Sequence, residues 1–391
     1  MRIGLVALHT SPLDAPGRGD AGGMNVVVRA LADELARAGH RVEVLTRAAS
    51  ASDVDRVAAL ESGARVRFLE AGAPGPLVKE QLPRITDEFA LRMLRLPRYD
   101  VLHSHYWLSG RAALPVARET HAAHVLSLHT VAAVKNARLA PGDRPEPAAR
   151  VDAERSLARG SDAVVASTRS ERDAIVVGYG ADAARVHVVE PGVDTALFRP
   201  GAAAARPRVL VVGRIQPLKG QDLAVRAVGS LPPSIRPQLL IAGEASGLGG
   251  ADYRARLEGL VAAGGLGDDV AFVGALPRAE LAALMRSCAL VLVPSRSETY
   301  GLVTLEAAAS GVPVVAARVP GLVDAVRDGV TGVLVDEHDE RAWAAAIERL
   351  LRDPARRAVL AAASLDHARA RSWTATALRM ATLYGNVARP S

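Results

Sequence analysis

The sequence predicts an α/β protein made of two doubly wound, Rossmann-like domains that face each other across a cleft. Short runs rich in valine and leucine alternate along the chain with helical segments rich in alanine and arginine. Apolar runs at this spacing are typical of parallel strands that helices cover on both faces. At 391 residues the chain is also too long for one ordinary core, which favours two domains.

Strand-like runs divide into two sets separated by a linker. The first set is RIGLVAL, RVEVLTR, ARVRFLEA, DVLHSH, HVLSLHT, DAVVAST and VHVVEPG. The second set is RVLVVGR, QLLIAGE, VAFVGA, ALVLVPS, VPVVAAR and TGVLVD. Between them FRPGAAAARPR has the small residues and the Pro/Gly content of a linker. We therefore predict a first domain over residues 1–197 and a second over 206–373.

Composition restricts the class of partner. Apolar residues make up 49% and charged residues 23%, which is typical of a folded globular chain. Aromatic residues are only 3%, which disfavours nucleic-acid binding by base stacking. The net charge of +6 is spread over helices that also carry acids, so we interpret it as a solvated surface. The composition does not exclude a local basic pocket that binds a small anion.

The single cysteine and the N-terminus exclude several further features. With Cys288 alone, an internal disulfide and a cysteine-based zinc site are excluded, and its apolar surroundings predict a buried thiol. The start MRIGLVAL is typical of a strand and not of a signal peptide. No apolar run approaches the ~20 residues of a membrane helix. We expect a cytoplasmic protein with no membrane span.

Ligands of doubly wound sheets bind where loops leave the carboxyl ends of strands. The first such loop with notable chemistry lies within HTSPLDAPGRGDAGGMNVVVRALADEL, residues 9–35. Gly22 and Gly23, at a helix start, let backbone N–H groups approach an anion closely. The glycine spacing differs from the dinucleotide-binding pattern. A merely flexible loop is the alternative.

The second place combines HSHYWLSG, residues 103–110, with SLHTVAAVKN, residues 127–136. His129 and Thr130 open a helix at a strand end and suit hydrogen bonding to a substrate hydroxyl or phosphate. We expect His103 and His105 to point to opposite faces of their strand. With no carboxylate close by in the sequence, this expectation disfavours a metal site.

The third place is VVGRIQPLKGQDLAVRAV, residues 211–228. Arg214 ends a strand and Lys219 follows five residues later, just before a helix. Two cations that converge at a helix start form a clamp for a diphosphate, through charge and bidentate geometry. The segment is no P-loop, because it lacks the Gly-Lys-Ser/Thr pattern.

The fourth place is PSRSETYGLVTLEAAASG, residues 294–311. Glu298 is expected in the loop over the cleft and Glu306 inside the helix that starts near Gly301. Neither glutamate has an obvious Lys or Arg partner one helical turn away. Exposed surface residues without a functional role are therefore the alternative interpretation. Three amides are expected at the positive end of the helix dipole: those of Tyr300, Gly301 and Leu302. Together the four places predict a nucleoside-diphosphate sugar held mainly by the second domain.

Paired α/β domains, Gly-Arg followed by lysine, and two glutamates eight residues apart resemble the retaining glycosyltransferases of the GT-B fold, family 4. The resemblance runs from residue 1 to about 385. HTSPLDAPGRGDAGGMNV, VLHSHYWLSG and HTVAAVKN are similar to the branch that glycosylates 1D-myo-inositol 3-phosphate, the first step of mycothiol biosynthesis. The resemblance implies N-acetylglucosamine carried by UDP, no required cofactor, and a C-terminal helix at about 374–391 that packs on the first domain.

The resemblance also implies roles for individual residues. Catalysis falls to His129, placed against the transferred sugar, and to Arg214, Lys219 and Glu298, with Glu306 on the ribose. Donor contacts are implied for Ala15, Pro16, Gly23, Arg214, Lys219, Arg278, Glu298, Tyr300, Gly301, Leu302 and Glu306. Acceptor contacts are implied for His9, Asp20, Ala21, Gly22, Gly23, Met24, Asn25, Lys79, Tyr106, Thr130 and Arg150. The last four of these are expected to hold the acceptor phosphate.

Two segments depart from the family pattern. GEASG at 243–247 replaces Gly-Gly-Pro-Ser-Gly, and SETYG replaces the commoner Glu-Ser-Phe-Gly. Both departures lie on the donor side, so the resemblance predicts the identity of the transferred sugar less firmly than that of the acceptor. The family also carries a structural divalent ion, such as magnesium, beside the segment that matches Met285, Arg286 and Ser287. Val312 stands where the family has threonine, which argues against that ion.

Other functions stay open at this point. Another glycosyltransferase, acting on an aminocyclitol, an antibiotic or another sugar acceptor, is the nearest alternative. An epimerase of the same fold would form no glycosidic bond, and a sugar-nucleotide sensor would have no activity. A homodimer is also left open.

Overall fold

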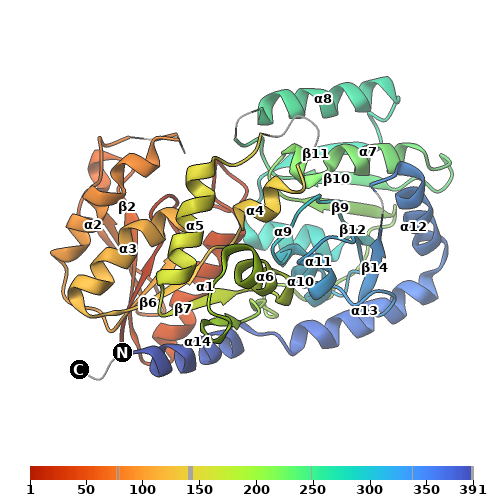
Figure 1. The fold of residues 1–391 in the computed structure, drawn as a ribbon. Helices are drawn as coiled ribbons and strands as arrows, with labels where there is room; N and C mark the ends of the chain where they lie inside the picture. Colours follow the sequence, from red (N-terminus) through yellow and green to blue (C-terminus); the bar gives the residue numbers. More distant parts are fainter. Residues whose placement is uncertain (76, 79, 140–143, 248, 337, 389–391) are drawn as a thin grey trace.

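The computed structural model describes residues 1–75, 77–78, 80–139, 144–247, 249–336 and 338–388. It contains two sheets, with strand orders β3-β4-β2-β1-β5-β6-β7-β8 and β11-β10-β9-β12-β13-β14. Each sheet forms the centre of one lobe, and Figure 1 shows the two lobes side by side with helices around each sheet. The predicted α/β class with two doubly wound sheets is therefore confirmed.

The strands are short and close to the predicted runs. The first sheet consists of β1 (Arg2–Val6), β2 (Arg41–Arg47), β3 (Val57–Ala59), β4 (Arg65–Leu69), β5 (Val101–His105), β6 (Ala123–Ser127), β7 (Ala163–Ala166) and β8 (Val186–Val188). The second consists of β9 (Arg208–Val212), β10 (Gln238–Ala242), β11 (Val270–Gly274), β12 (Leu290–Val293), β13 (Val314–Ala317) and β14 (Gly332–Val335).

The helices alternate with these strands. The first lobe has α1 (Gly23–Arg37), α2 (Thr86–Leu94), α3 (Trp107–Thr120), α4 (Ala132–Asn136), α5 (Ala148–Gly160) and α6 (Arg169–Asp173). The second has α7 (Gln221–Gly229), α8 (Gly250–Ala263), α9 (Arg278–Arg286), α10 (Leu302–Ala309), α11 (Leu322–Ala325), α12 (Glu340–Arg352) and α13 (Pro354–Arg369), and α14 (Trp373–Val387) follows. Short turns of 3-10 or π type are η1 (Ala51–Asp53), η2 (Leu82–Ile85), η3 (Ala174–Gly178), η4 (Ala183–Arg185) and η5 (Pro217–Lys219).

Strand β3 is the one the sequence did not predict. It pairs antiparallel with β4 at the edge of the first sheet, whereas the other pairings are parallel. Its three residues are partly or fully exposed. A strand this short at a solvent-facing edge produces no buried apolar run in the sequence.

The core explains why the central strands are apolar throughout. In β1, Ile3 and Leu5 pack in one cluster with residues of α1 and α14, whereas Val6 packs in another with residues of α2 and α3. Helices therefore cover both faces of the sheet, and neighbouring residues of a strand are buried on opposite sides. One continuous cluster forms the core of the second lobe. Cys288 lies in that cluster, and burial raises the pKa of its thiol to about 11, as expected for a structural thiol.

The end of the chain returns to the first lobe. In Figure 1, α13 runs beneath the second lobe and α14 lies beneath the first. Met380 and Tyr384 of α14 are buried in the cluster that also contains the buried face of α1. Where the chain passes between the two lobes, Val193 N donates to the Arg371 carbonyl at 2.9 Å. The outgoing and the returning segments therefore run side by side. The division of the chain at 197 and 206 stays a prediction.

Length and polarity set the helices apart from membrane spans. Within the described residues, no helix combines the length and the apolar content that crossing a bilayer would require.

The buried His124 gives a testable link between pH and stability. Its ring nitrogens bond to the hydroxyls of Ser104 and Ser161, each at 2.9 Å, and burial lowers the pKa to about 3 from an ordinary value of 6.5. As the pH falls below 6.5 the unfolded chain takes up the proton first, so this stability is present above that pH and is lost toward pH 3.

We expect His124→Gln to reduce the loss of unfolding free energy between pH 7 and pH 5 by about 2 kcal/mol relative to the natural chain. Urea unfolding at the two pH values measures both losses. Equal losses in the two proteins would contradict the buried, neutral imidazole.

Candidate functional site

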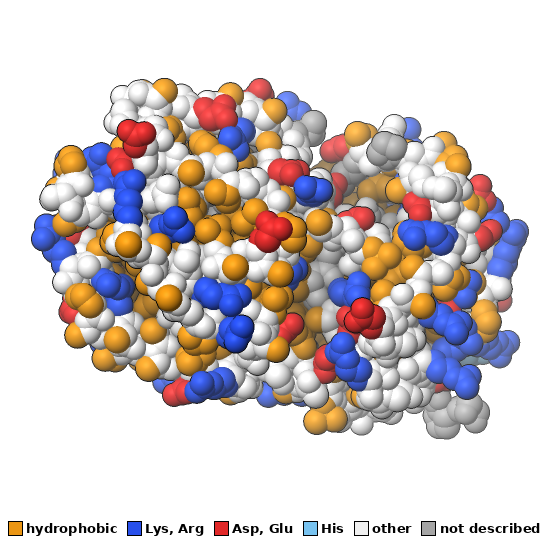
Figure 2. All heavy atoms as spheres, turned by 180° about the vertical axis from the view of Figure 1, so that it is seen from behind, with side chains coloured by type: hydrophobic (Ala, Val, Ile, Leu, Met, Phe, Trp, Pro, Cys, Tyr) orange, Lys and Arg blue, Asp and Glu red, His pale blue; other side chains and the backbone are white. Residues whose placement is uncertain are grey.

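Loops of the two lobes that carry predicted site residues meet between the two sheets. The Ser246 hydroxyl donates to the Gly19 carbonyl at 2.6 Å, and the Thr299 hydroxyl donates to the His129 carbonyl at 2.6 Å. Figure 2 shows the two lobes meeting along a furrow, with charged side chains of both signs beside it. The four places that the sequence singled out therefore line a single interlobe site.

The glycine-containing loop is tied down by Asn25. The Asn25 side chain accepts a hydrogen bond from Gly22 N at 3.0 Å and donates to the Ser11 carbonyl at 2.6 Å. These bonds join the loop after β1 to the first turn of α1, which disfavours a merely flexible loop. The other loop residues predicted for the site lie in the same segment: His9, Ala15, Pro16, Asp20, Ala21 and Met24.

Two helix N-termini approach each other across the furrow. Gly23 begins α1 and Leu302 begins α10. A Cβ on Gly23 would lie 3.3 Å from Leu302 Cδ1, so glycine permits the approach. Each N-terminus carries a partial positive charge and unsatisfied N–H groups. A place where two such ends converge suits an anion.

The predicted cations Arg214 and Lys219 lie at this convergence. Arg214 follows the end of β9, and its guanidinium lies 3.7 Å from the Asp20 carboxylate of the glycine-containing loop. Lys219 ends η5 and forms an ion pair with Glu298. The structure therefore brings the two cations to the site, and each faces a carboxylate.

Both glutamates of the fourth place have distant partners. Glu298 accepts from Lys219, 79 residues away, and from the Ser295 hydroxyl at 3.0 Å. Glu306 is 4% exposed and pairs with Arg278, which is 28 residues away. Burial raises the pKa of Glu306, and Arg278 opposes that shift. The alternative interpretation of these two glutamates as exposed, unpaired surface residues is therefore wrong.

The start of α10 has the backbone that the sequence predicted. Gly301 has φ +82° as the cap of α10, and a Cβ there would come 2.5 Å from Leu322 Cδ2. Tyr300 before it is buried. The loop between Glu298 and Leu302 is thus fixed by a glycine that packs against α11.

The histidines form a buried group beneath the furrow. His105 Nδ1 and His129 Nε2 are 2.8 Å apart, and the rings of His103 and His105 lie 4.2 Å apart. The expectation of opposite faces is wrong, because residues two apart on a strand project from the same face. Burial lowers the pKa of His129 to about 4, so the ring is neutral at pH 7 and acts through hydrogen bonds. Within the described part of the chain, no three potential ligand residues gather into a metal-binding group.

Three of the four predicted phosphate-binding residues come together on the first lobe. Arg150 Nη2 donates to Thr130 Oγ1 at 2.7 Å, and the Arg150 guanidinium lies 4.7 Å from the centre of the Tyr106 ring. Tyr106 has φ +77° where β5 turns into α3, and it is buried. Lys79, the fourth residue, lies outside the described residues.

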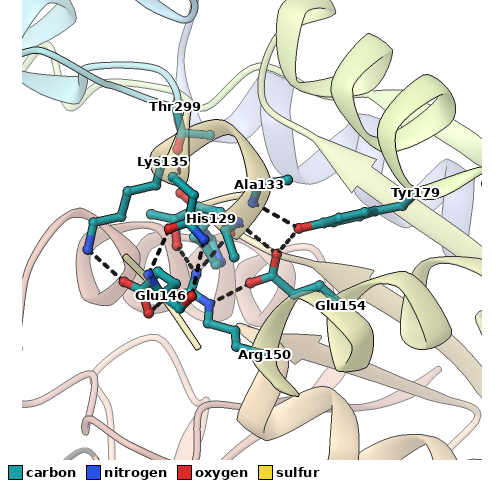
Figure 3. A network of polar contacts seen from close by, with 11 residues as sticks. His129, Ala133, Lys135, Glu146, Arg150, Glu154, Tyr179 and Thr299 are labelled. Carbon is teal, nitrogen blue, oxygen red and sulfur yellow. Dashed lines mark hydrogen bonds and ion pairs between the residues drawn. The ribbon is translucent and has the colours of Figure 1, made fainter. Parts of the chain in front are cut away.

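The sequence did not reveal what surrounds Arg150. Its side chain is 3% exposed, and it forms ion pairs with Glu146 at 2.8 Å and with Glu154 at 2.6 Å. Glu146 also pairs with Lys135 at 2.6 Å, and Figure 3 shows the chain of contacts. The spacing Glu-x-x-x-Arg-x-x-x-Glu at the start of α5 was the available signal, since residues four apart are neighbours on a helix.

The segment expected to lie beside a structural ion offers backbone carbonyls but no side-chain oxygen at Val312. The carbonyls of Met285 and Ser287 each accept one backbone hydrogen bond, from Cys288 and Ala204, at 3.0 Å. Val312 is buried and its side chain has no oxygen. Hard divalent cations require several oxygen ligands. The structural ion therefore stays a prediction.

Comparisons with known proteins identify relatives over nearly the whole chain. The model of "Family 4 Glycosyltransferase in conflict systems" matches residues 17–380. D-inositol 3-phosphate glycosyltransferase of Salinispora arenicola is 44% identical over 98% of this chain and 91% of its own length. The protein of the same name from Stackebrandtia nassauensis is 45% identical over 98% and 91%.

Solved structures agree on the fold. A sucrose-phosphate synthase from Thermosynechococcus elongatus is 31% identical, with a TM-score of 0.92 over 98% of each chain. Anabaena HepE, solved in complex with UDP and glucose, is 21% identical, with a TM-score of 0.80 over 99% of this chain and 100% of its own. The second likeness concerns the fold alone.

The Arg278–Glu306 pair generates a stability prediction. We expect Arg278→Leu to lower the unfolding free energy by about 1–3 kcal/mol, because the buried Glu306 loses its partner while Arg278 itself is partly solvated. The double variant Arg278→Leu/Glu306→Leu should recover most of that loss, since both charges are then removed. Denaturant unfolding of the two single variants and the double variant measures the coupling.

The exposed Glu348–Arg352 pair on α12 is the matched control. Its cycle should give a coupling of no more than about 0.5 kcal/mol. Additive losses in the Arg278–Glu306 cycle would contradict a buried, mutually dependent pair.

Proposed function

The chain belongs to glycosyltransferase family 4, and from this premise we propose that it transfers N-acetylglucosamine from UDP-N-acetylglucosamine to 1D-myo-inositol 3-phosphate. It is an enzyme of the GT-B fold, with two doubly wound lobes. The proposed reaction is the first step of mycothiol biosynthesis and takes place in the cytoplasm. No resident metal or other cofactor takes part in it.

The donor is proposed to lie where the helix N-termini and the two cations converge. A diphosphate there is met by Arg214, by Lys219 and by the first N–H groups of α10. Glu298 is proposed to release Lys219 to the diphosphate and to hold hydroxyls of the sugar. Glu306, beside Arg278, is proposed to hold the ribose diol. The geometric support is that Arg214 faces Asp20 of the first lobe, Lys219 pairs with Glu298, and Glu306 pairs with Arg278.

One observation carries the acceptor proposal. Tyr106, Thr130 and Arg150 come from separate places in the sequence, yet Arg150 contacts both of the others, and Thr130 directly follows His129. Together with Lys79 they would supply two cations and two hydroxyls, which suit a phosphomonoester. The relatives that share 43–45% identity with this chain are named for inositol 3-phosphate, which supports the same acceptor class.

The proposed chemistry retains the configuration at the anomeric carbon. The bond from that carbon to the UDP oxygen breaks, and a bond to an acceptor hydroxyl oxygen forms on the same face. The hydroxyl proton passes to the departing diphosphate oxygen, so atoms and charge balance. Arg214, Lys219 and the α10 N-terminus stabilise the developing negative charge on UDP. His129 is neutral and orients a sugar hydroxyl through hydrogen bonding.

An acceptor that carries an amine is the second candidate, because one observation favours it. The carboxylates of Glu146 and Glu154 neutralise Lys135 and Arg150 at the acceptor side. A site with no net positive charge accepts an aminocyclitol at a lower electrostatic cost than a phosphate. The acceptor experiment below separates the two candidates.

Loss of one clamp cation should slow the transfer strongly. We expect Lys219→Ala to lower kcat by roughly 10²–10³, the scale for removing one group that stabilises developing charge. Steady-state assays with UDP-N-acetylglucosamine measure the change. Arg352→Ala, at the exposed end of α12, is the control and should keep the natural rate. A natural rate in Lys219→Ala would refute the donor assignment.

The acceptor phosphate should dominate acceptor selection. We expect the natural enzyme to prefer inositol 3-phosphate over inositol, and Lys79→Ala to raise the KM for inositol 3-phosphate by about ten- to a hundred-fold. The KM for the UDP-sugar should stay the same, because Arg214 and Lys219, which are proposed to hold the donor, lie in the second lobe. Equal use of inositol and inositol 3-phosphate by the natural enzyme would overturn the phosphate acceptor. An aminocyclitol as the best substrate would establish the second candidate.

A further inference from the structure

Arg150 is fully engaged by groups of its own chain. Nε donates to Glu154 at 2.6 Å, and Nη1 lies 2.8 Å from a Glu146 carboxylate oxygen. Nη2 donates to Thr130 Oγ1 at 2.7 Å and is 3.3 Å from the Thr130 carbonyl. All three guanidinium nitrogens therefore have partners, and a phosphate that takes the position of the Glu146 carboxylate at Nη1 must displace it.

The two glutamates on Arg150 differ in how they are held. Glu154 has a fully buried side chain, and it also accepts hydrogen bonds from Ala132 N at 2.8 Å and from the Tyr179 hydroxyl at 2.6 Å. Removing it would leave several buried donors unsatisfied, so Glu154 is a permanent structural partner. Glu146 is 12% exposed and its carboxylate contacts two side-chain cations, Lys135 and Arg150.

The backbone of Glu146 is anchored independently of its carboxylate. Glu146 N donates to Asn136 Oδ1 at 2.7 Å, and Asn136 Nδ2 donates to the Glu146 carbonyl at 3.1 Å. These bonds hold the residue at the start of α5 even when its side chain turns away. In Figure 3 the Glu146 carboxylate lies between Lys135 and Arg150, on the opposite side of the guanidinium from Glu154.

The charges at this place cancel. Lys135 and Arg150 balance Glu146 and Glu154, so these four side chains carry no net charge. A phosphomonoester dianion that reached Arg150 with Glu146 in place would meet a carboxylate at hydrogen-bonding distance from the same guanidinium. Like charges this close destabilise each other strongly. Once Glu146 leaves, Lys135 and the Nη1 edge of Arg150 are both available to an anion.

We propose that Glu146 is an internal anion that occupies part of the phosphate subsite of the acceptor, and that the acceptor phosphate displaces it. This inference rests on the proposed function for its substrate and assigns Glu146 and Lys135 as specificity-determining residues. The exchange of one anion for another keeps Arg150 paired at every stage, which avoids an isolated buried charge. It also disfavours uncharged acceptors, because they cannot replace the carboxylate.

The test compares Glu146→Gln with the natural enzyme, since glutamine keeps the size and removes the charge. We expect the KM for inositol 3-phosphate to fall by about three- to ten-fold, while the KM for the UDP-sugar stays the same. Asp152→Asn removes the same charge from the same helix at an exposed position that pairs only with Arg155 in the contacts described. This control should keep the natural KM. An unchanged or higher KM for inositol 3-phosphate in Glu146→Gln would overturn the inference.

Inorganic phosphate gives a readout that does not depend on the identity of the acceptor. We expect calorimetric titration of the full chain to show tighter phosphate binding by Glu146→Gln, and weaker binding by Lys135→Gln, than by the natural enzyme. Tighter binding without any transfer to inositol 3-phosphate would support the subsite and refute the proposed acceptor. Equal phosphate affinity in all three folded proteins would refute the subsite. If Glu146→Gln fails to fold, Glu146→Ser allows the same comparison.

Discussion

Ion pairs within the chain hold the walls of the interlobe site in place. Lys219 meets Glu298, Arg278 meets Glu306, and Arg150 meets Glu154. Removing charges from water is costly unless each is paired and hydrogen-bonded. The chain therefore brings its cations to the furrow already matched with its own carboxylates. Under the proposed function, a charged substrate binds to these cations by exchanging with their internal carboxylate partners.

Positive electrostatic potential at the same site also comes from helix N-termini, and so does not rely on unpaired lysine or arginine side chains. The N-termini of α1 and α10 approach each other where Gly23 lies against Leu302, and their partial charges cannot be neutralised by rearranging a side chain. Beside them His129 is neutral because burial lowers its pKa. In the proposed donor complex a diphosphate is held by these fixed dipoles and by released cations, while His129 contributes hydrogen bonds. This division of roles suits a leaving group whose negative charge increases during the reaction.

Contacts between the lobes pass through the two segments that depart from the family pattern. In GEASG, Glu244 pairs with Arg18 at 3.4 Å and Ser246 bonds to Gly19. In SETYG, the Thr299 hydroxyl bonds to the carbonyl of His129. Ser246 matches the serine of the family pattern and Thr299 keeps a hydroxyl where that pattern has serine, so of these three contacts only the Glu244–Arg18 pair comes from a departure. Because His129 receives a bond from the opposite lobe, any opening of the furrow would also release the backbone of that histidine.

Local patterns in the sequence predicted every strand of the described residues except β3, and also the loops with the chemically notable residues. Runs of valine and leucine identify buried parallel strands, because a strand that is covered on both faces requires apolar side chains at consecutive positions. Glycines at helix starts identify places where the backbone approaches another group closely. The same local reasoning could not find β3, which is short and exposed. Only the tertiary structure decided which charges meet. Glu298 finds its lysine 79 residues away, and Arg150 is enclosed by Glu146, Glu154 and Thr130. The Lys219–Glu298 pairing depends on the distance between loops that follow different strands, which no pattern along the chain encodes, whereas the i, i+4 spacing of the two glutamates around Arg150 is visible in the sequence.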